Sequence, residues 1–217
     1  MRVAVLGAKG KVGREVLAQI AAAPDLVLGA TPARGLLATA RGGGDVLVDF
    51  SSPGAVMELL DALADDPLPL VIGTTGFSPD QAARLAAEGA RRPILTGANF
   101  TLGFGAFRQA GLALAAALPG ASLTVAETYN AAKKPVASGT TQALVADLGA
   151  SGRAVETEIN RVGDTPGITT LRFGLGVADI SLTLAVQSRA AYAAGALAAA
   201  RWLCSRGNGS YSPFDIS

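Results

Sequence analysis

The architecture of this chain follows from its opening residues, RVAVLGAKGKVGREVLAQIAA (2–22). The apolar run RVAVL is typical of a buried parallel strand, and the periodic apolar residues after the glycines predict a helix. Between them, Gly7 would permit a tight turn, Gly10 would let the backbone approach a pyrophosphate, and Gly13 would let the helix pack on the strand. The spacing is GxxGxxG rather than the strict GxGxxG fingerprint, which leaves a glycine-rich turn without a ligand as the alternative. We therefore predict a dinucleotide-binding unit at the start of the chain.

Strand and helix patterns continue to alternate through the first half of the chain. Apolar runs predict further strands at Leu26–Ala30, Val46–Phe50, Leu70–Gly73 and Pro93–Thr96. Ser51-Ser52-Pro53 begins a predicted helix that runs to about Ala64, and Ser78 caps another that starts with Pro79. Each predicted strand is followed by Gly, Ser, Thr or Asn. Such residues suit the ligand crevice at the carboxyl ends of a parallel sheet.

After residue 101 the pattern changes. The helices expected in this part are Thr101–Leu118, Thr140–Leu148 and Arg189–Cys204. A strand is expected at Ser122–Glu127, and alternating residues predict antiparallel strands at Ala154–Arg161, Ile168–Phe173 and Ile180–Val186. We therefore predict an α/β fold with a Rossmann-type parallel sheet in a dinucleotide-binding domain (1–101 and 187–217). An inserted α+β domain with a mostly antiparallel sheet (102–186) would bind the substrate and form oligomer contacts.

The residues after the second predicted strand bear on the choice of nucleotide. An acidic residue there would bind the ribose 2′-hydroxyl of NAD and repel a 2′-phosphate. The chain instead has Thr31-Pro32-Ala33-Arg34, and a guanidinium can bind a phosphate bidentately. We predict NADPH as the cofactor, with NADH as the alternative. The competing interpretation of Arg34 is a solvated loop residue.

The segment ETYNAAKKPVASGT (127–140) carries the densest group of reactive side chains. Backbone N–H groups at a helix start attract anions, and a lysine just upstream adds a full charge. The combination of Lys133 with Ser138, Gly139 and Thr140 therefore suits a small substrate that carries carboxylates. The alternative is an ordinary lysine-bearing loop followed by a helix that Ser138 caps.

Composition excludes several classes of function. The 18 basic and 17 acidic residues nearly cancel, so the chain lacks the clustered basic face that nucleic-acid binding requires. With no histidine and the single cysteine Cys204, neither a zinc site nor an internal disulfide is expected. The chain starts directly on a strand pattern, and Arg189, Gly195 and Arg201 break the alanine-rich run that ends at Cys204. We therefore expect no metal, no signal peptide and no membrane span, which favours the cytoplasm.

Taken together, these motifs resemble the 4-hydroxy-tetrahydrodipicolinate reductase family of the lysine pathway, also called dihydrodipicolinate reductases. The resemblance covers essentially the whole chain. Glu127, Lys133 and the SGT triplet at 138–140 carry part of it. The other motifs are GAKGKVG (7–13), VDFSSP (48–53), VIGTTGF (71–77), GANFTLG (97–103), RVGDTPG (161–167), SRAAYAAGAL (188–197) and YSPFDIS (211–217).

The resemblance implies an NAD(P)H-dependent reductase of diaminopimelate and lysine biosynthesis that forms a homotetramer through its second domain. With Thr31 and Arg34 added from the ribose argument, the expected cofactor-binding residues are Gly7, Ala8, Lys9, Gly10, Lys11, Val12, Thr31, Arg34, Phe50, Gly73, Thr74, Thr75, Ala98, Asn99 and Phe100. The substrate carboxylates are expected at Asn130, Lys133, Ser138, Gly139 and Thr140.

The chain also departs from the family pattern E-x-H-H-x-x-K-x-D-x-P-S-G-T. Tyr129 replaces the histidine that the family uses as proton donor, and Asn130 replaces the second histidine. Pro135 and Ala137 stand where the family has aspartate and proline. The proton donor is then Tyr129, Lys133 or water. Two alternative functions follow: reduction of another carboxylated imine, or a catalytically silent NADP(H)-binding protein.

Overall fold

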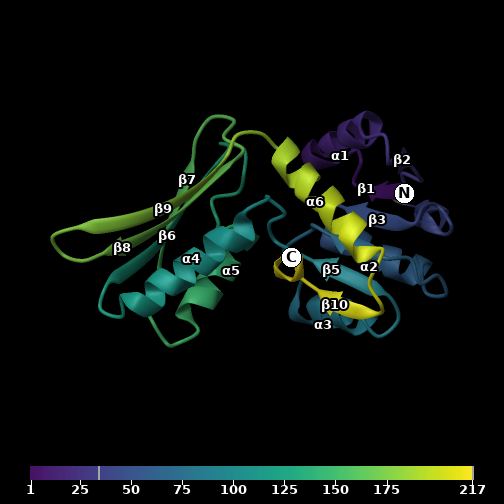
Figure 1. Ribbon diagram of the computed structural model, residues 1–217. Helices are drawn as coiled ribbons and strands as arrows, with labels where there is room; N and C mark the ends of the chain where they lie inside the picture. Colours follow the sequence, from purple (N-terminus) through teal and green to yellow (C-terminus); the bar gives the residue numbers. More distant parts are fainter. Residues whose placement is uncertain (34, 217) are drawn as a thin grey trace. The chain divides into compact units, whose positions relative to one another are not determined.

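A computed structural model describes residues 1–33 and 35–216 of the protein. The chain forms two compact units (Figure 1). Unit 1 consists of Met1–Leu102 and Arg189–Ser217, and unit 2 consists of Gly103–Ser188. The chain therefore leaves unit 1 once and returns to it with its last segment.

Unit 1 is built on a parallel sheet. Within the described residues this sheet has six strands in the order β10-β5-β4-β3-β1-β2, and every neighbouring pair is parallel. Its elements are β1 (Arg2–Leu6), α1 (Lys11–Ala22), β2 (Val27–Leu28), the 3-10 helix η1 (Leu37–Ala40), β3 (Val46–Asp49), α2 (Pro53–Ala62), β4 (Leu70–Ile72), α3 (Pro79–Glu88), β5 (Pro93–Thr96), α6 (Ala190–Leu203), β10 (Gly209–Tyr211) and the 3-10 helix η2 (Pro213–Asp215). The sequence prediction missed β10, because GSY is short and has no apolar run.

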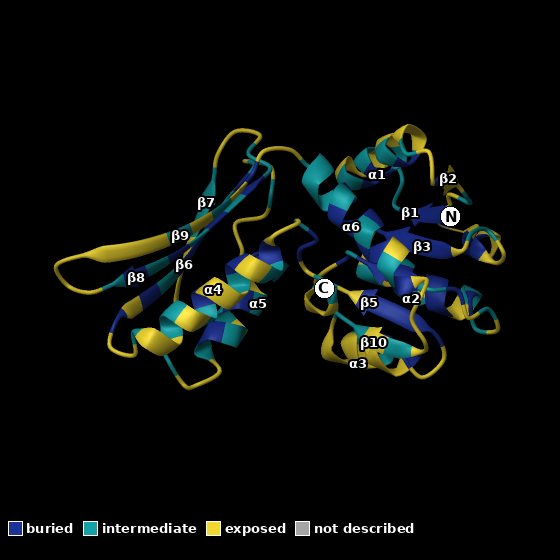
Figure 2. Cartoon of the chain, viewed as in Figure 1, coloured by how far each residue is buried: buried dark blue, intermediate teal, exposed yellow. Residues whose placement is uncertain are grey.

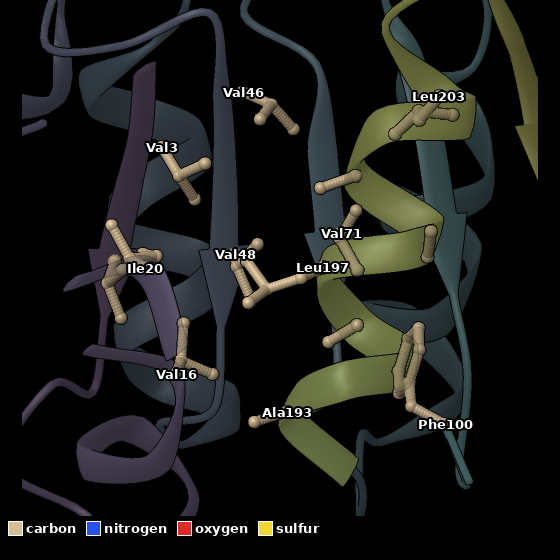
Figure 3. Packing of buried hydrophobic residues seen from close by; sticks show 14 of the residues in the cluster. Val3, Val16, Ile20, Val46, Val48, Val71, Phe100, Ala193, Leu197 and Leu203 are labelled. Carbon is tan, nitrogen blue, oxygen red and sulfur yellow. The ribbon is translucent and has the colours of Figure 1, made fainter. Parts of the chain in front are cut away.

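Alternate residues of the strands face two different helical layers. On β1, Val3 and Val5 belong to a core cluster with α1 and α6, whereas Ala4 and Leu6 belong to a cluster with α2. Figure 3 shows how Leu197 of α6 lies against the sheet beside the valines of β3 and β4. Each such side chain contributes about 1.5–3 kcal/mol when it leaves water. The crevice residues therefore stand on a sheet that is buried on both faces.

The alanine-rich helix α6 is a core helix. Its small residues allow close packing: a Cβ on Gly195 would lie 1.5 Å from the carbonyl oxygen of Phe100. Ala193, Ala196 and Ala200 are fully buried. Across residues 1–33 and 35–216, no helix combines the length and the apolar character needed to cross a membrane.

Three helix starts follow the local sequence signals. Ser52 and Ser138 each accept a hydrogen bond from a backbone N–H in the first turn of α2 and α5 (Gly139–Gly149). Ser78 forms a reciprocal capping box with Gln81 at the start of α3. The capping roles predicted for Ser78 and Ser138 are thus confirmed, and each cap contributes about 1 kcal/mol.

Unit 2 packs two helices on one face of a second sheet. Its elements are α4 (Phe104–Ala117), β6 (Ser122–Tyr129), α5, β7 (Glu156–Arg161), β8 (Gly167–Gly174) and β9 (Asp179–Val186). The buried cluster between these helices and the sheet includes Phe107 of α4, Leu144 of α5 and Phe173 of β8. Figure 2 shows the unit coloured by burial. The side chains of Thr124, Thr128 and Thr170 on the opposite face are partly exposed.

The strand order in unit 2 is β7-β6-β8-β9. The β6–β8 and β8–β9 pairs are antiparallel, as predicted, but β7 runs parallel to β6. The antiparallel expectation for Ala154–Arg161 was therefore wrong. The reason is that α5 carries the chain back between β6 and β7, as a helical crossover does between parallel strands. Alternation alone reports which face is buried, and it carries no information on strand direction.

Candidate active site

The glycine turn after β1 leaves no space for side chains. Gly7 has φ +82°, and a Cβ there would lie 2.3 Å from the carbonyl oxygen of Phe50. A Cβ on Gly13 would lie 2.1 Å from the carbonyl oxygen of Gly7. These contacts bring α1 against the end of β1 and match the roles expected for the first and third glycines. Gly10 precedes α1 without a side-chain cap, so the helix presents its first-turn N–H groups to an anion.

The residues around this turn are accessible. Lys9, Gly10 and Lys11 are exposed, and Ala8 and Val12 are half-buried. Two ammonium groups beside a helix N-terminus favour a pyrophosphate. The geometry of the turn therefore fits a dinucleotide.

The loops after β3, β4 and β5 meet at the carboxyl edge of the same sheet. The ring of Phe50 stands edge-on to Phe100, with centroids 6.0 Å apart. A Cβ on Gly73 would lie 2.3 Å from the Phe50 ring, and the N–H of Ser51 donates to the Thr74 hydroxyl at 2.9 Å. The structure thus brings together several of the residues that the sequence assigned to a cofactor.

Thr75 and Ala98 line a cavity of about 300 Å³ between this edge, α3 and β10. Asn99 is buried, and its side-chain oxygen accepts the N–H of Thr101 at 2.8 Å. That bond shapes the loop after β5. Thr31 is exposed beyond β2 at the edge of the sheet, whereas Arg34 lies outside the described residues.

Asp49 is a buried carboxyl at the same edge of the sheet, and the sequence did not predict a role for it. It ends β3, is 0% exposed, and accepts a hydrogen bond from the Ser51 hydroxyl. Burial raises the pKa of Asp49 to about 6, although the Ser51 hydrogen bond offsets part of that increase. The motif VDFSSP contained the signal, because an acid within an otherwise apolar strand is rarely buried without a role.

In unit 2, Tyr129 and Lys133 form a stacked pair. Tyr129 is the last residue of β6, and the ammonium of Lys133 lies 3.5 Å from the centroid of its ring. Backbone bonds hold the segment: Lys133 N–H donates to the carbonyl of Asn130 at 3.0 Å, and Ala131 N–H donates to that of Gly163 at 2.8 Å. Burial lowers the pKa of Lys133, while the charge of Glu127 raises it and that of Arg161 lowers it further.

The start of α5 follows on the same face of this unit. Ser138 and Thr140 are buried, and Gly139 is half-buried. The N–H of Ser138 donates to the carboxylate of Glu127, two residues before Tyr129 on β6, at 3.0 Å. Lys133 and the helix start are therefore anchored to the same strand end. An ammonium group and a positive helix end can bind a dianion there.

Among residues 1–33 and 35–216, no group of three or more His, Cys, Asp and Glu side chains is placed to hold a metal ion.

Comparison with known proteins covers both units. The family models "Dihydrodipicolinate reductase, N-terminus" and "Dihydrodipicolinate reductase, C-terminus" match residues 1–100 and 103–216. A 4-hydroxy-tetrahydrodipicolinate reductase of Thermomicrobium roseum is 35% identical over 256 residues, which cover 100% of this chain and 99% of that protein.

Solved structures share the fold. A dipicolinate-bound dihydrodipicolinate reductase from Paenisporosarcina sp. TG-14 has a TM-score of 0.73 and 16% identity, over 98% of this chain and 97% of that one. An engineered D-amino acid dehydrogenase bound to NADP⁺ has a TM-score of 0.58 and 13% identity, over 100% of this chain and 94% of that one. Since the two family models and the T. roseum relative span both units, the chain belongs to the dihydrodipicolinate reductase family and is an oxidoreductase.

Proposed function

We propose that the protein reduces 4-hydroxy-tetrahydrodipicolinate to tetrahydrodipicolinate with NADPH, in diaminopimelate and lysine biosynthesis. The single observation that carries the substrate assignment is the pairing, at one strand end, of the Lys133 ammonium with the capped start of α5. That arrangement suits a small dicarboxylate. The T. roseum relative is named as a reductase of such a compound, and the structural neighbour from Paenisporosarcina is bound to dipicolinate.

On the cofactor side, we assign the pyrophosphate to residues 7–12 and the nicotinamide end to Phe50, residues 73–75 and residues 98–100. The bound dinucleotide would supply the hydride. The protein's contribution is a close-packed turn under the pyrophosphate: any side chain at position 7 would clash with the carbonyl oxygen of Phe50. Thr31 and Arg34 support NADPH over NADH, and a neighbour of the same fold binds NADP⁺.

On the substrate side, we assign one carboxylate to Lys133 and the other to Ser138, Gly139 and Thr140, with Asn130 at the rim. Lys133 has a second task, because reduction of an imine-bearing ring also needs a proton. Its pKa is lowered by burial, which brings the ammonium closer to the operating pH and makes it a better acid. Tyr129 supports that ammonium with its ring face.

The decisive assay follows NADPH absorbance with purified protein and freshly generated 4-hydroxy-tetrahydrodipicolinate. The proposed function requires consumption of NADPH that depends on the substrate. Lys133→Ala should raise the substrate KM about 10- to 100-fold, the cost of losing a hydrogen bond to a charged group. The matched control is Lys134→Ala, because Lys134 is the exposed neighbour. Equal KM values for both variants would remove Lys133 from the site.

One observation favours a second candidate, reduction of another carboxylated imine. Tyr129 and Asn130 stand where the family has histidines, so the walls of the substrate site differ from the family pattern. Substrate-dependent NADPH consumption with a related cyclic imine, and none with the lysine-pathway intermediate, would select this candidate. Binding of NADPH without turnover of either compound would select the silent paralogue.

We also propose a homotetramer located in the cytoplasm, from the family resemblance. The partly exposed sheet face of unit 2, with Thr124, Thr128 and Thr170, is the surface that we assign to subunit contacts. Light scattering coupled to size-exclusion chromatography should give four times the mass of 21.7 kDa. A monomeric mass at micromolar concentration would reject the assembly.

A further inference from the structure

Glu127 is a buried carboxylate that accepts hydrogen bonds from three other residues of unit 2. It lies on β6 and is 1% exposed. One of its oxygens accepts the N–H of Ser138 at 3.0 Å and the hydroxyl of Thr141, and the other accepts Nη2 of Arg161 at 2.7 Å. A buried charge persists only when it is paired and hydrogen-bonded, and all of the donors to Glu127 come from the segment after β6 or from the end of β7.

The guanidinium of Arg161 donates hydrogen bonds to the backbone of the same segment. Nε donates to the carbonyl of Lys134 at 3.0 Å, and Nη2 donates to that of Val136 at 2.7 Å. Nη1 donates to the carbonyl of Asn160 at 2.8 Å. All three guanidinium nitrogens therefore bond inside unit 2, and the side chain is only 11% exposed. The backbone between Lys133 and Ser138 is held at Lys134 and Val136 by this single side chain.

The charges of the pair also matter. Burial alone would raise the pKa of Glu127, but the hydrogen bonds from Ser138, Thr141 and Arg161 outweigh it and lower the pKa. Glu127 is thus ionised at neutral pH. On Lys133, the charge of Glu127 raises the pKa and that of Arg161 lowers it, so the two effects oppose each other.

The segment needs this support because of its own sequence. Ala137 stands where the family pattern has proline, so no ring restricts the backbone just before Ser138. The Arg161 bonds and the bond from the Gln142 amide to the carbonyl of Ala137, at 3.0 Å, restrain the backbone instead. Without the pair, ordering the segment would cost conformational entropy each time a ligand binds.

We propose that Glu127 and Arg161 are positioning residues, which fix residues 133–141 so that Lys133 and the first turn of α5 meet a dicarboxylate in a preformed geometry. This inference rests on the proposed function for the identity of the ligand. It assigns Arg161 to the protein scaffold, and it assigns contact with the carboxylates to Lys133 and the helix start.

The test compares Glu127→Gln and Arg161→Lys with the matched variants Glu158→Gln and Arg172→Lys. The control residues form an ion pair at 3.4 Å in the same unit whose side chains are 48% and 42% exposed. Three quantities are measured: the Kd of dipicolinate, the Kd of NADPH, and amide hydrogen exchange of peptides that cover residues 133–141. We expect both test variants to bind dipicolinate at least about tenfold more weakly and to exchange faster in this segment. The NADPH Kd and both control variants should stay as in the wild type.

The outcomes are distinct. If only Arg161→Lys weakens dipicolinate binding, Arg161 touches the ligand directly and the positioning role is wrong. If exchange in residues 133–141 is unchanged in both test variants, the inference is overturned whatever the affinity does. If exchange rises while wild-type affinity is retained, the order of the segment does not matter for binding, which also overturns it. If the wild type neither binds dipicolinate nor consumes NADPH, the proposed function fails, and hydrogen exchange still decides whether the pair holds the segment.

Discussion

Asp49 makes the stability of this protein depend on pH, because its buried carboxyl gains a proton more readily in the folded protein than in the unfolded chain. Its carboxyl has an ordinary pKa of 3.8 and a pKa of about 6 in the folded protein, because burial disfavours the charged form. The folded state therefore binds a proton more tightly than the unfolded chain does between these two values. Stability is greatest at low pH within this range and is lost as the pH rises through 6, the reverse of a carboxyl stabilised by a salt bridge.

The size of the effect follows from the pKa difference. Each pH unit is worth about 1.4 kcal/mol, so complete ionisation of Asp49 costs the folded state about 3 kcal/mol. At pH 5 the native carboxyl is still mostly protonated, whereas the unfolded carboxyl is ionised. About 1 kcal/mol of this is then lost between pH 5 and pH 7.5, and the remainder is lost below pH 5. The chain has no histidine, so no histidine titration overlaps this window.

The assay is urea unfolding of wild type, Asp49→Asn and Asp65→Asn at pH 5 and pH 7.5. The asparagine at position 49 can still accept the Ser51 hydrogen bond but cannot ionise. Between pH 5 and pH 7.5, the wild type and the exposed-site control Asp65→Asn should each lose about 1 kcal/mol more of their free energy of unfolding than Asp49→Asn loses. Parallel pH dependence in wild type and Asp49→Asn would refute the reasoning, because the slope would then arise elsewhere.

Two further substitutions test the residues that we assign to NADPH binding. Gly13→Ala places a Cβ 2.1 Å from the Gly7 carbonyl oxygen. We expect it to weaken NADPH binding at least about tenfold and to lower Tm, whereas Gly54→Ala, in open space on α2, should raise Tm slightly. Arg34→Ala should weaken NADPH about 10- to 100-fold and leave NADH unchanged, as measured by fluorescence titration. Equal loss for both nucleotides would leave the 2′-phosphate assignment without support.

Local signals explain most of what could be predicted from the sequence. The capping serines Ser78 and Ser138 act within one turn of themselves, so their neighbours in sequence are also their partners in space. The role of Gly13 follows for the same reason, because its close contact is the carbonyl oxygen of Gly7. The strand β5 was predicted at its observed bounds, because its short apolar run starts at Pro93 and Gly97 follows its last residue, Thr96.

Features that depend on residues far apart in the sequence could not be predicted from local sequence patterns. Glu127 and Arg161 are 34 residues apart, and only the parallel pairing of β6 with β7 brings them together. That pairing was itself mispredicted, since alternation in β7 does not reveal direction. Similarly, the sequence GSY of β10 does not indicate a strand by itself, and its strand conformation depends on hydrogen bonds to β5. The burial of Asp49 required knowledge of both layers that cover the sheet.

The identity of the proton donor depends on the stack between Lys133 and Tyr129. A general acid must carry its proton before the step and works best with a pKa near the operating pH. Burial moves the pKa of Lys133 downward toward that range. Tyr129 offers its ring to the ammonium at 3.5 Å, a contact that phenylalanine can also make.

Tyr129→Phe should therefore keep kcat within about threefold, because it preserves the aromatic face. Lys133→Gln should lower kcat about 100-fold or more, the usual cost of losing a general acid. The wild-type kcat should also fall as the pH rises through the lowered pKa of Lys133, since the neutral amine has no proton to give at that position. A collapse of kcat in Tyr129→Phe, with dipicolinate affinity retained, would instead assign the proton to the phenol and leave Lys133 as a carboxylate clamp alone.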